Sequence, residues 1–142
     1  MFHKVLVPLD GTSGSEKAVP YAQGLAKALG TGVAVCHVIT TPTGQRSERE
    51  QRDAKRYLAK MAHQFRMAEI PVEKVLRKGE APLEIQKAAQ ECGADAIVMA
   101  TRSRRRFEKL VLGSVADVIV RDSRLPVLLV SSRRALPVRR AA

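Results

Sequence analysis

The residues best suited to ligand chemistry lie in three short segments, residues 8–11, 37–38 and 100–114, each of which follows an apolar run. The first segment places the carboxylate of Asp10 before a glycine, and the third contains a cluster of arginines that begins at Arg102. A guanidinium group can form two charge-assisted hydrogen bonds to one phosphate. The third segment could therefore bind an anionic ligand, provided that the fold brings the three segments together.

Each of these features also has an interpretation that involves no ligand. An aspartate before a glycine is common in turns, where Asp10 would bond to its own backbone. The arginines of residues 102–106 could be solvated, or could pair with Glu108 and other acids. Gly113 and Ser114 could form a tight entry into a helix with Ser114 as its N-cap, although a helix N-terminus is itself a site for anions. The sequence alone leaves both interpretations open.

The sequence assembles neither a metal site nor a catalytic triad. His3, His37 and His63 fall in different predicted elements, and Cys36 and Cys92 lack the spacing of metal-binding or redox pairs. We interpret both cysteines as buried thiols, because such thiols behave as small apolar side chains. We therefore expect no metal, no catalytic residue and a protein that is not an enzyme.

The composition indicates one globular domain. The chain has 142 residues, of which 45% are hydrophobic and 27% charged, which is enough to form a packed core. No stretch has the length and apolarity of a membrane-spanning helix, and residues 1–8 lack the pattern of a cleavable leader. We expect a domain over residues 1–131, a flexible basic tail over residues 132–142, no membrane contact and a cytoplasmic location.

The net charge of +11 is unusual, and much of it comes from residues 102–106 and from the tail. Positive charge attracts polyanions, so nucleic acid is a candidate partner. Aromatic residues make up 4% of the chain, however, and Phe107 alone flanks the arginines, so a platform for stacking bases is missing. Binding to a specific nucleic acid is therefore not expected.

Short β-branched runs alternate with amphipathic segments along the whole chain. The predicted strands cover residues 4–9, 32–39, 72–76, 95–101 and 126–130, and the predicted helices cover residues 13–29, 46–68, 83–91 and, after an irregular start, 110–120. Ser13 and Glu16 have the spacing of a capping box at the first helix. This alternation predicts a doubly wound α/β domain, with right-handed crossovers and helices on both faces of a parallel sheet.

Five motifs follow one another in a specific order and spacing between residues 4 and 130. They are Val5-Leu6-Val7-Pro8-Leu9-Asp10-Gly11-Thr12, Cys36-His37-Val38, Gly93-Ala94-Asp95-Ala96-Ile97-Val98-Met99, Leu112-Gly113-Ser114-Val115-Ala116 and Leu125-Pro126-Val127-Leu128-Leu129-Val130. Together they resemble the universal stress protein family. The resemblance implies a five-stranded parallel sheet of order 3-2-1-4-5, as in the adenine-nucleotide alpha hydrolase-like fold, and a homodimer. It also implies that the chain belongs either to a branch that binds ATP or AMP or to a branch that does not.

The resemblance further implies where a nucleotide would bind, at the carboxyl ends of the first, second and fourth strands. Carried over residue by residue, the site would contain Pro8, Leu9, Asp10, Val38, Ala100, Arg102, Ser103, Gly113, Ser114 and Val115. Asp10 would contact the nucleoside, and the backbone of Val38 would lie near the base.

The phosphate loop of the ATP-binding branch has the pattern G-x-x-G, nine residues, then G-S or G-T. Gly113 and Ser114 match the final pair, but Ala100 and Ser103 stand in place of the two leading glycines. Glycine lets a phosphate approach the backbone closely. The arginine side chains would therefore have to replace part of the lost backbone cradle.

Two functions follow from the resemblance. The chain could be a regulatory domain that binds ATP or AMP, or a nucleotide-free dimeric interaction protein of the stress response with a degenerate ATP loop. The replacements at Ala100 and Ser103 motivate the second. In both cases a homodimer would form through the apolar last strand, residues 127–130, at the edge of the sheet.

Overall fold

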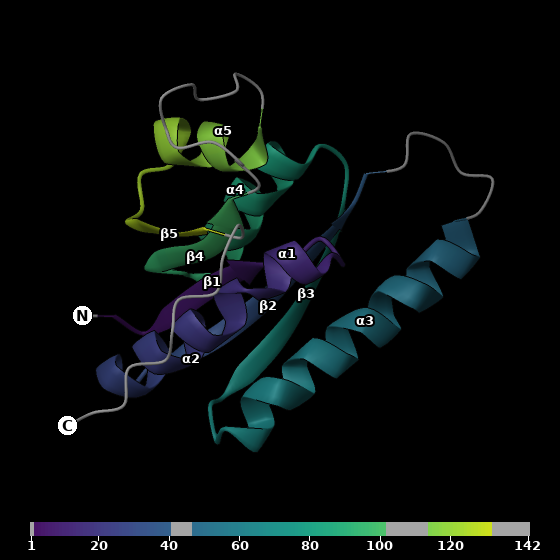
Figure 1. The fold of residues 1–142 in the computed structure, drawn as a ribbon. Helices are drawn as coiled ribbons and strands as arrows, with labels where there is room; N and C mark the ends of the chain where they lie inside the picture. Colours follow the sequence, from purple (N-terminus) through teal and green to yellow (C-terminus); the bar gives the residue numbers. More distant parts are fainter. Residues whose placement is uncertain (1, 41–46, 102–113, 132–142) are drawn as a thin grey trace.

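The computed structural model describes residues 2–40, 47–101 and 114–131. Five parallel strands form one sheet of order β3-β2-β1-β4-β5 (Figure 1). The strands are β1 (Lys4–Pro8), β2 (Gly32–Ile39), β3 (Val72–Lys78), β4 (Ala96–Thr101) and β5 (Val127–Ser131), and the helices are α1 (Ser13–Glu16), α2 (Ala18–Leu29), α3 (Ser47–Met67), α4 (Ala81–Cys92) and α5 (Val115–Asp122). The predicted parallel sheet and its order are confirmed.

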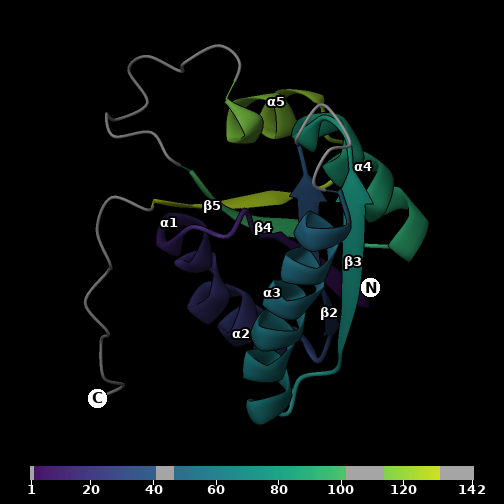
Figure 2. The ribbon, with the colours of Figure 1, turned by 90° about the vertical axis from the view of Figure 1, so that its right-hand side faces the viewer.

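Helices cover both faces of the sheet, with α2 and α3 on one side and α4 and α5 on the other (Figure 2). Neighbouring residues of β1 point to opposite faces, so that Val5 and Val7 pack under α2 and α3 while Leu6 packs under α4 and α5. This two-sided burial explains why the three central strands, β1, β2 and β4, are near-continuous apolar runs. No helix of the described chain has the length and apolarity needed to cross a membrane.

The two cysteines differ in how far they enter the core between the sheet and the helices α4 and α5. Cys36 in β2 is buried, and burial raises the pKa of its thiol to about 12. Cys92, at the end of α4, is only half-buried, so the prediction of two buried thiols is correct for Cys36 alone.

The first predicted helix, residues 13–29, is instead two helices separated at Lys17. The N-cap is Thr12, whose hydroxyl accepts a hydrogen bond from the Ser15 N–H at 3.2 Å, so the predicted cap at Ser13 was wrong by one residue. Pro20 explains the interruption, because it has no N–H to bond to the carbonyl four residues earlier. Since Pro20 lies in the first turn of α2, it does not disturb the rest of that helix.

Candidate functional site

A cavity of about 800 Å³ opens at the carboxyl ends of β1, β2 and β4. β1 is the strand from which the chain winds to one side through β2 and to the other through β4, and open α/β sheets bind ligands at such a point. Of the predicted site residues, Pro8, Leu9, Asp10, Val38, Ala100, Ser114 and Val115 line this cavity. The other three, Arg102, Ser103 and Gly113, lie outside the described residues.

The first wall of the cavity is formed by the tips of the strands, and we call Pro8, Leu9, Asp10, Val38 and Ala100 the strand-end wall. Its central residue, Leu9, is held by the backbone and side chains of β2. The Leu9 N–H donates to the carbonyl of Cys36 at 2.8 Å, and Nδ1 of His37 donates to the Leu9 carbonyl at 2.7 Å. The position of the strand tip is therefore fixed by hydrogen bonds on both sides of the Leu9 Cα.

Asp10 forms the turn that follows this tip. Its Oδ1 accepts hydrogen bonds from the backbone N–H of Thr12 at 2.9 Å and from the Thr12 hydroxyl at 2.6 Å. Gly11 follows with φ of +90°, a conformation that a side chain would disfavour. The interpretation of Asp10 as turn chemistry is thus confirmed, and the same turn presents Asp10 at the cavity.

The second wall belongs to α3, and we call Glu50, Asp53, Ala54 and Tyr57 the helix wall. Steps of three and four residues place these side chains on one face of the helix. None of them was predicted to belong to the site, because residues 46–68 were predicted only to form an amphipathic helix. One feature of the sequence could have indicated these residues. Because α3 follows β2 in the chain, its first turns are expected near the edge of the sheet where β2 ends.

Tyr57 joins the helix wall to the rest of the domain. Its hydroxyl donates to Oε2 of Glu16 in α1 at 2.8 Å. Its ring meets the imidazole of His37 edge to face, with centroids 5.4 Å apart. Burial and the hydrogen bond to Glu16 raise the pKa of Tyr57, so the hydroxyl keeps its proton and remains a donor. His37 thus contacts both walls, since it also binds Leu9.

The third side of the cavity is the start of α5. Ser114 is its N-cap, as predicted, and its Oγ accepts a hydrogen bond from the N–H of Asp117 at 3.1 Å. Ser114, Val115 and Ala116 all line the cavity. The first N–H groups of a helix lack intrahelical acceptors and carry partial positive charge. This side of the cavity is therefore suited to an anionic group.

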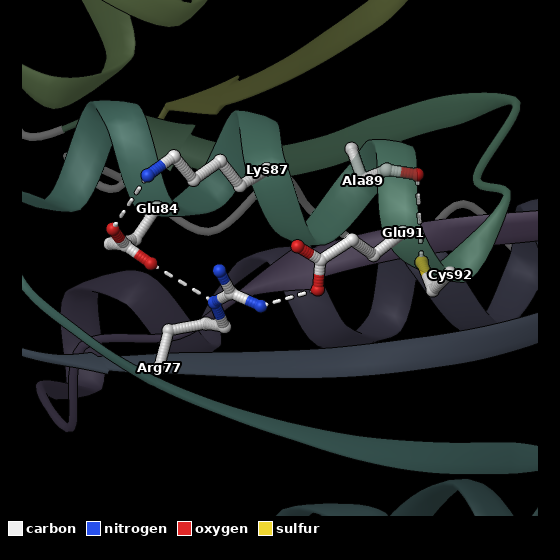
Figure 3. Close-up of polar contacts among 6 residues, drawn as sticks. All are labelled: Arg77, Glu84, Lys87, Ala89, Glu91 and Cys92. Atoms are coloured by element: carbon white, nitrogen blue, oxygen red, sulfur yellow. Dashed lines mark hydrogen bonds and ion pairs between the residues drawn. The ribbon is translucent and has the colours of Figure 1, made fainter.

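An ion-pair network anchors α4, which contributes Ala81 and Ile85 to the cavity. Nε of Arg77 in β3 lies 3.0 Å from Oε1 of Glu84, and its Nη1 lies 2.5 Å from Oε1 of Glu91 (Figure 3). These two hydrogen bonds raise the pKa of Arg77. The network ties the first and last turns of α4 to the edge strand. Within the described residues, no group of three His, Cys, Asp or Glu side chains could hold a metal ion.

The sequence over residues 1–131 matches the profile of the universal stress protein family. The chain belongs to the universal stress protein family. A universal stress protein of Methanocaldococcus jannaschii is 25% identical over an alignment of 143 positions, which covers 92% of this chain and 82% of the relative.

Solved structures of the family share the fold. The universal stress protein of Archaeoglobus fulgidus superposes with a TM-score of 0.74 at 27% identity, over 91% of this chain and 98% of that one. A universal stress protein solved in complex with cAMP gives a TM-score of 0.76 at 22% identity, over 92% and 98% of the two chains.

Proposed function

We propose that the chain is a regulatory domain that binds an adenine nucleotide, ATP or AMP, in the cavity at the strand tips. The observation that carries this proposal is the cavity of about 800 Å³ at the switch point of the sheet, lined by seven residues that the family resemblance had assigned to a nucleotide. A solved family member with the same fold holds cAMP, an adenine nucleotide of a size that suits such a cavity.

The charges around the cavity support one orientation of the nucleotide. The phosphates would lie at the N-terminus of α5, near Ser114 and Val115, where backbone N–H groups favour an anion. The nucleoside would lie against the strand-end wall, with Asp10 accepting from the sugar hydroxyls. Glu50 and Asp53 on the helix wall would repel phosphate, so they favour the same orientation.

The replacement of glycine at Ala100 and Ser103 shifts part of the phosphate binding to side chains under this proposal. Arg102 and the arginines that follow would bind the phosphates, with Ser103 and Gly113 completing the loop. Such a site binds and releases a nucleotide and does not catalyse a reaction. We expect no metal in this site, because the arginines would balance the phosphate charge.

Isothermal titration of nucleotide-stripped protein with ATP, ADP, AMP and cAMP tests this function. We expect saturable heat with at least one of them, and none with the matched pyrimidine nucleotide CTP, since the cavity would be selective for the base. If no adenine nucleotide gives heat at millimolar concentration, the nucleotide-binding function is contradicted. The alternative, a nucleotide-free dimeric interaction protein, is then favoured.

The same proposal includes the limits of the domain and the location of the protein in the cell. Residues 1–131 would form the working domain, residues 132–142 a dispensable basic tail, and the protein would act in the cytoplasm.

A homodimer would form through β5, an edge strand in which Leu128 is 43% exposed. Light scattering should give a dimer for the parent and a monomer for Leu128→Glu; a parent that is already monomeric contradicts the dimer.

A further inference from the structure

The outer face of α3 carries a line of basic side chains. Arg49, Arg52, Arg56, Lys60, His63 and Arg66 follow one another in steps of three or four residues, and all six are exposed. Such steps keep side chains on one face of a helix. We call these six residues the α3 basic stripe.

The stripe lies opposite the face by which α3 packs on the sheet. Leu58, Met61 and Phe65 on that inner face are fully buried. Figure 1 shows α3 at the periphery of the domain, with no other described element beyond it. The stripe is therefore the part of α3 that faces outward.

Negative charge on α3 is confined to its first two turns, where Glu48, Glu50 and Asp53 lie. Between Ala54 and Met67 every charged residue is cationic. Within the described chain, one ion pair involves the stripe, from Nη1 of Arg56 to Oδ1 of Asp53 at 3.7 Å, and the Arg56 side chain is still 80% exposed. A pair this exposed is weakly coupled, so the cations are available to an external anion.

We propose that the α3 basic stripe binds the phosphate backbone of a nucleic-acid duplex without reading its sequence. From Arg49 to Arg66 a helix rises about 25 Å, which equals the axial length of roughly seven base-pair steps of a duplex. A rigid, straight row of charges suits a polymer whose charges are also regularly spaced. Four of the six residues are arginines, which can bind phosphate through two hydrogen bonds.

The composition of the stripe favours phosphates over other anionic partners. It contains no Phe, Tyr or Trp side chain that could stack on bases, so contacts would be confined to the backbone. Insertion into a membrane would need an apolar face, and the apolar face of α3 is already packed on the sheet. The stripe is also separate from the nucleotide cavity, which α3 contacts through its helix wall.

Fluorescence anisotropy with a labelled DNA duplex of about twenty base pairs tests the proposal, using the full chain over a series of salt concentrations. The test variant is Arg52→Gln/Arg56→Gln/Lys60→Gln, since glutamine keeps the helix propensity and the exposed position. The matched control is Lys27→Gln/Lys78→Gln/Arg124→Gln, which removes the same charge from exposed positions outside the stripe. Circular dichroism verifies that both variants are folded.

We expect the test variant to bind at least tenfold more weakly at low salt. Its slope of log K against log salt should be shallower by about 3, because each lost phosphate contact changes the slope by about 0.9. The control should bind within threefold of the parent. Equal losses in both variants would show that only net charge matters, and would overturn the proposal.

Two further results would also overturn it. In one, deletion of residues 132–142 abolishes duplex binding while the stripe substitutions have no effect. That result would assign duplex binding to the tail. The other is stripe-dependent binding to vesicles of phosphatidylserine and phosphatidylcholine, with duplex binding unchanged in the test variant. That result would assign the stripe to an anionic lipid surface.

Discussion

The strand-end wall and the helix wall of the cavity are held in place in different ways. The strand-end wall continues the hydrogen bonding of the sheet, since Leu9 binds both Cys36 and His37 through its backbone. The helix wall is placed by packing and by side-chain contacts of Tyr57 with Glu16 and with the His37 ring.

This difference indicates that the two walls would have different roles in nucleotide binding. Backbone hydrogen bonds within a sheet fix atoms closely, so the strand-end wall is suited to orienting a nucleoside. Side-chain contacts on a helix permit replacement without loss of the fold, so the helix wall is suited to adjusting affinity. Substitutions in the strand-end wall should therefore affect binding more than those in the helix wall.

The largest effect is expected at Asp10. Asp10→Ala should weaken nucleotide binding about a hundredfold, or about 2.7 kcal/mol, because a charged acceptor and the turn with Thr12 are lost together. Isothermal titration gives the affinity. Asp10→Asn is the matched control, since its amide oxygen can still accept from Thr12. Nucleotide affinity unchanged in the alanine variant would show that this wall does not orient the ligand.

His37 contacts both walls, so its substitution is expected to have the second-largest effect. His37→Ala should lower the free energy of unfolding by about 2 kcal/mol, of which about half is the hydrogen bond to Leu9 and the rest the ring contact with Tyr57. Urea denaturation measures this value. A double-mutant cycle with Tyr57→Phe separates the two parts, and the absence of any destabilisation would mean that the walls are not linked through this ring.

Tyr57→Phe should cost about 1 kcal/mol of stability, through loss of the hydrogen bond to Glu16, and should change nucleotide affinity less than threefold. The pKa of Tyr57 is raised from its ordinary 10 in the folded state. The protonated Tyr57 hydroxyl therefore contributes its full share of the free energy of unfolding below pH 10. This contribution decreases as the pH rises through the pKa of Tyr57 in the folded state. Unfolding measured from pH 8 to pH 11 should show this decrease in the parent and less of it in the variant.

The smallest effect is expected at Asp53, an exposed acid of the helix wall. Asp53→Asn removes a repulsion between this carboxylate and the phosphates, so ATP should bind less than threefold more tightly. Titration at low and high salt measures this, and the gain should vanish at high salt. A large loss of affinity would mean that Asp53 contacts the ligand directly.

The sequence predicted the sheet and the strand-end wall well for a physical reason. Buried parallel strands are apolar runs between turns, and topology then places Asp10, Val38 and Ala100 at one edge. The helix wall was missed because periodicity shows that Tyr57 faces inward but does not show whether it meets the core or a cavity. The break at Lys17 was missed because the effect of Pro20 depends on its exact distance from the start of the helix.

Leu9 lies one residue beyond the end of β1, yet its N–H and its carbonyl are both bonded to β2. Separation of Leu9 from β2 therefore requires the sheet itself to open locally. In deuterium exchange the amide of Leu9 should follow the slow kinetics of the strands rather than the fast kinetics of surface loops. The first connection of the chain thus starts from a point as rigid as the core.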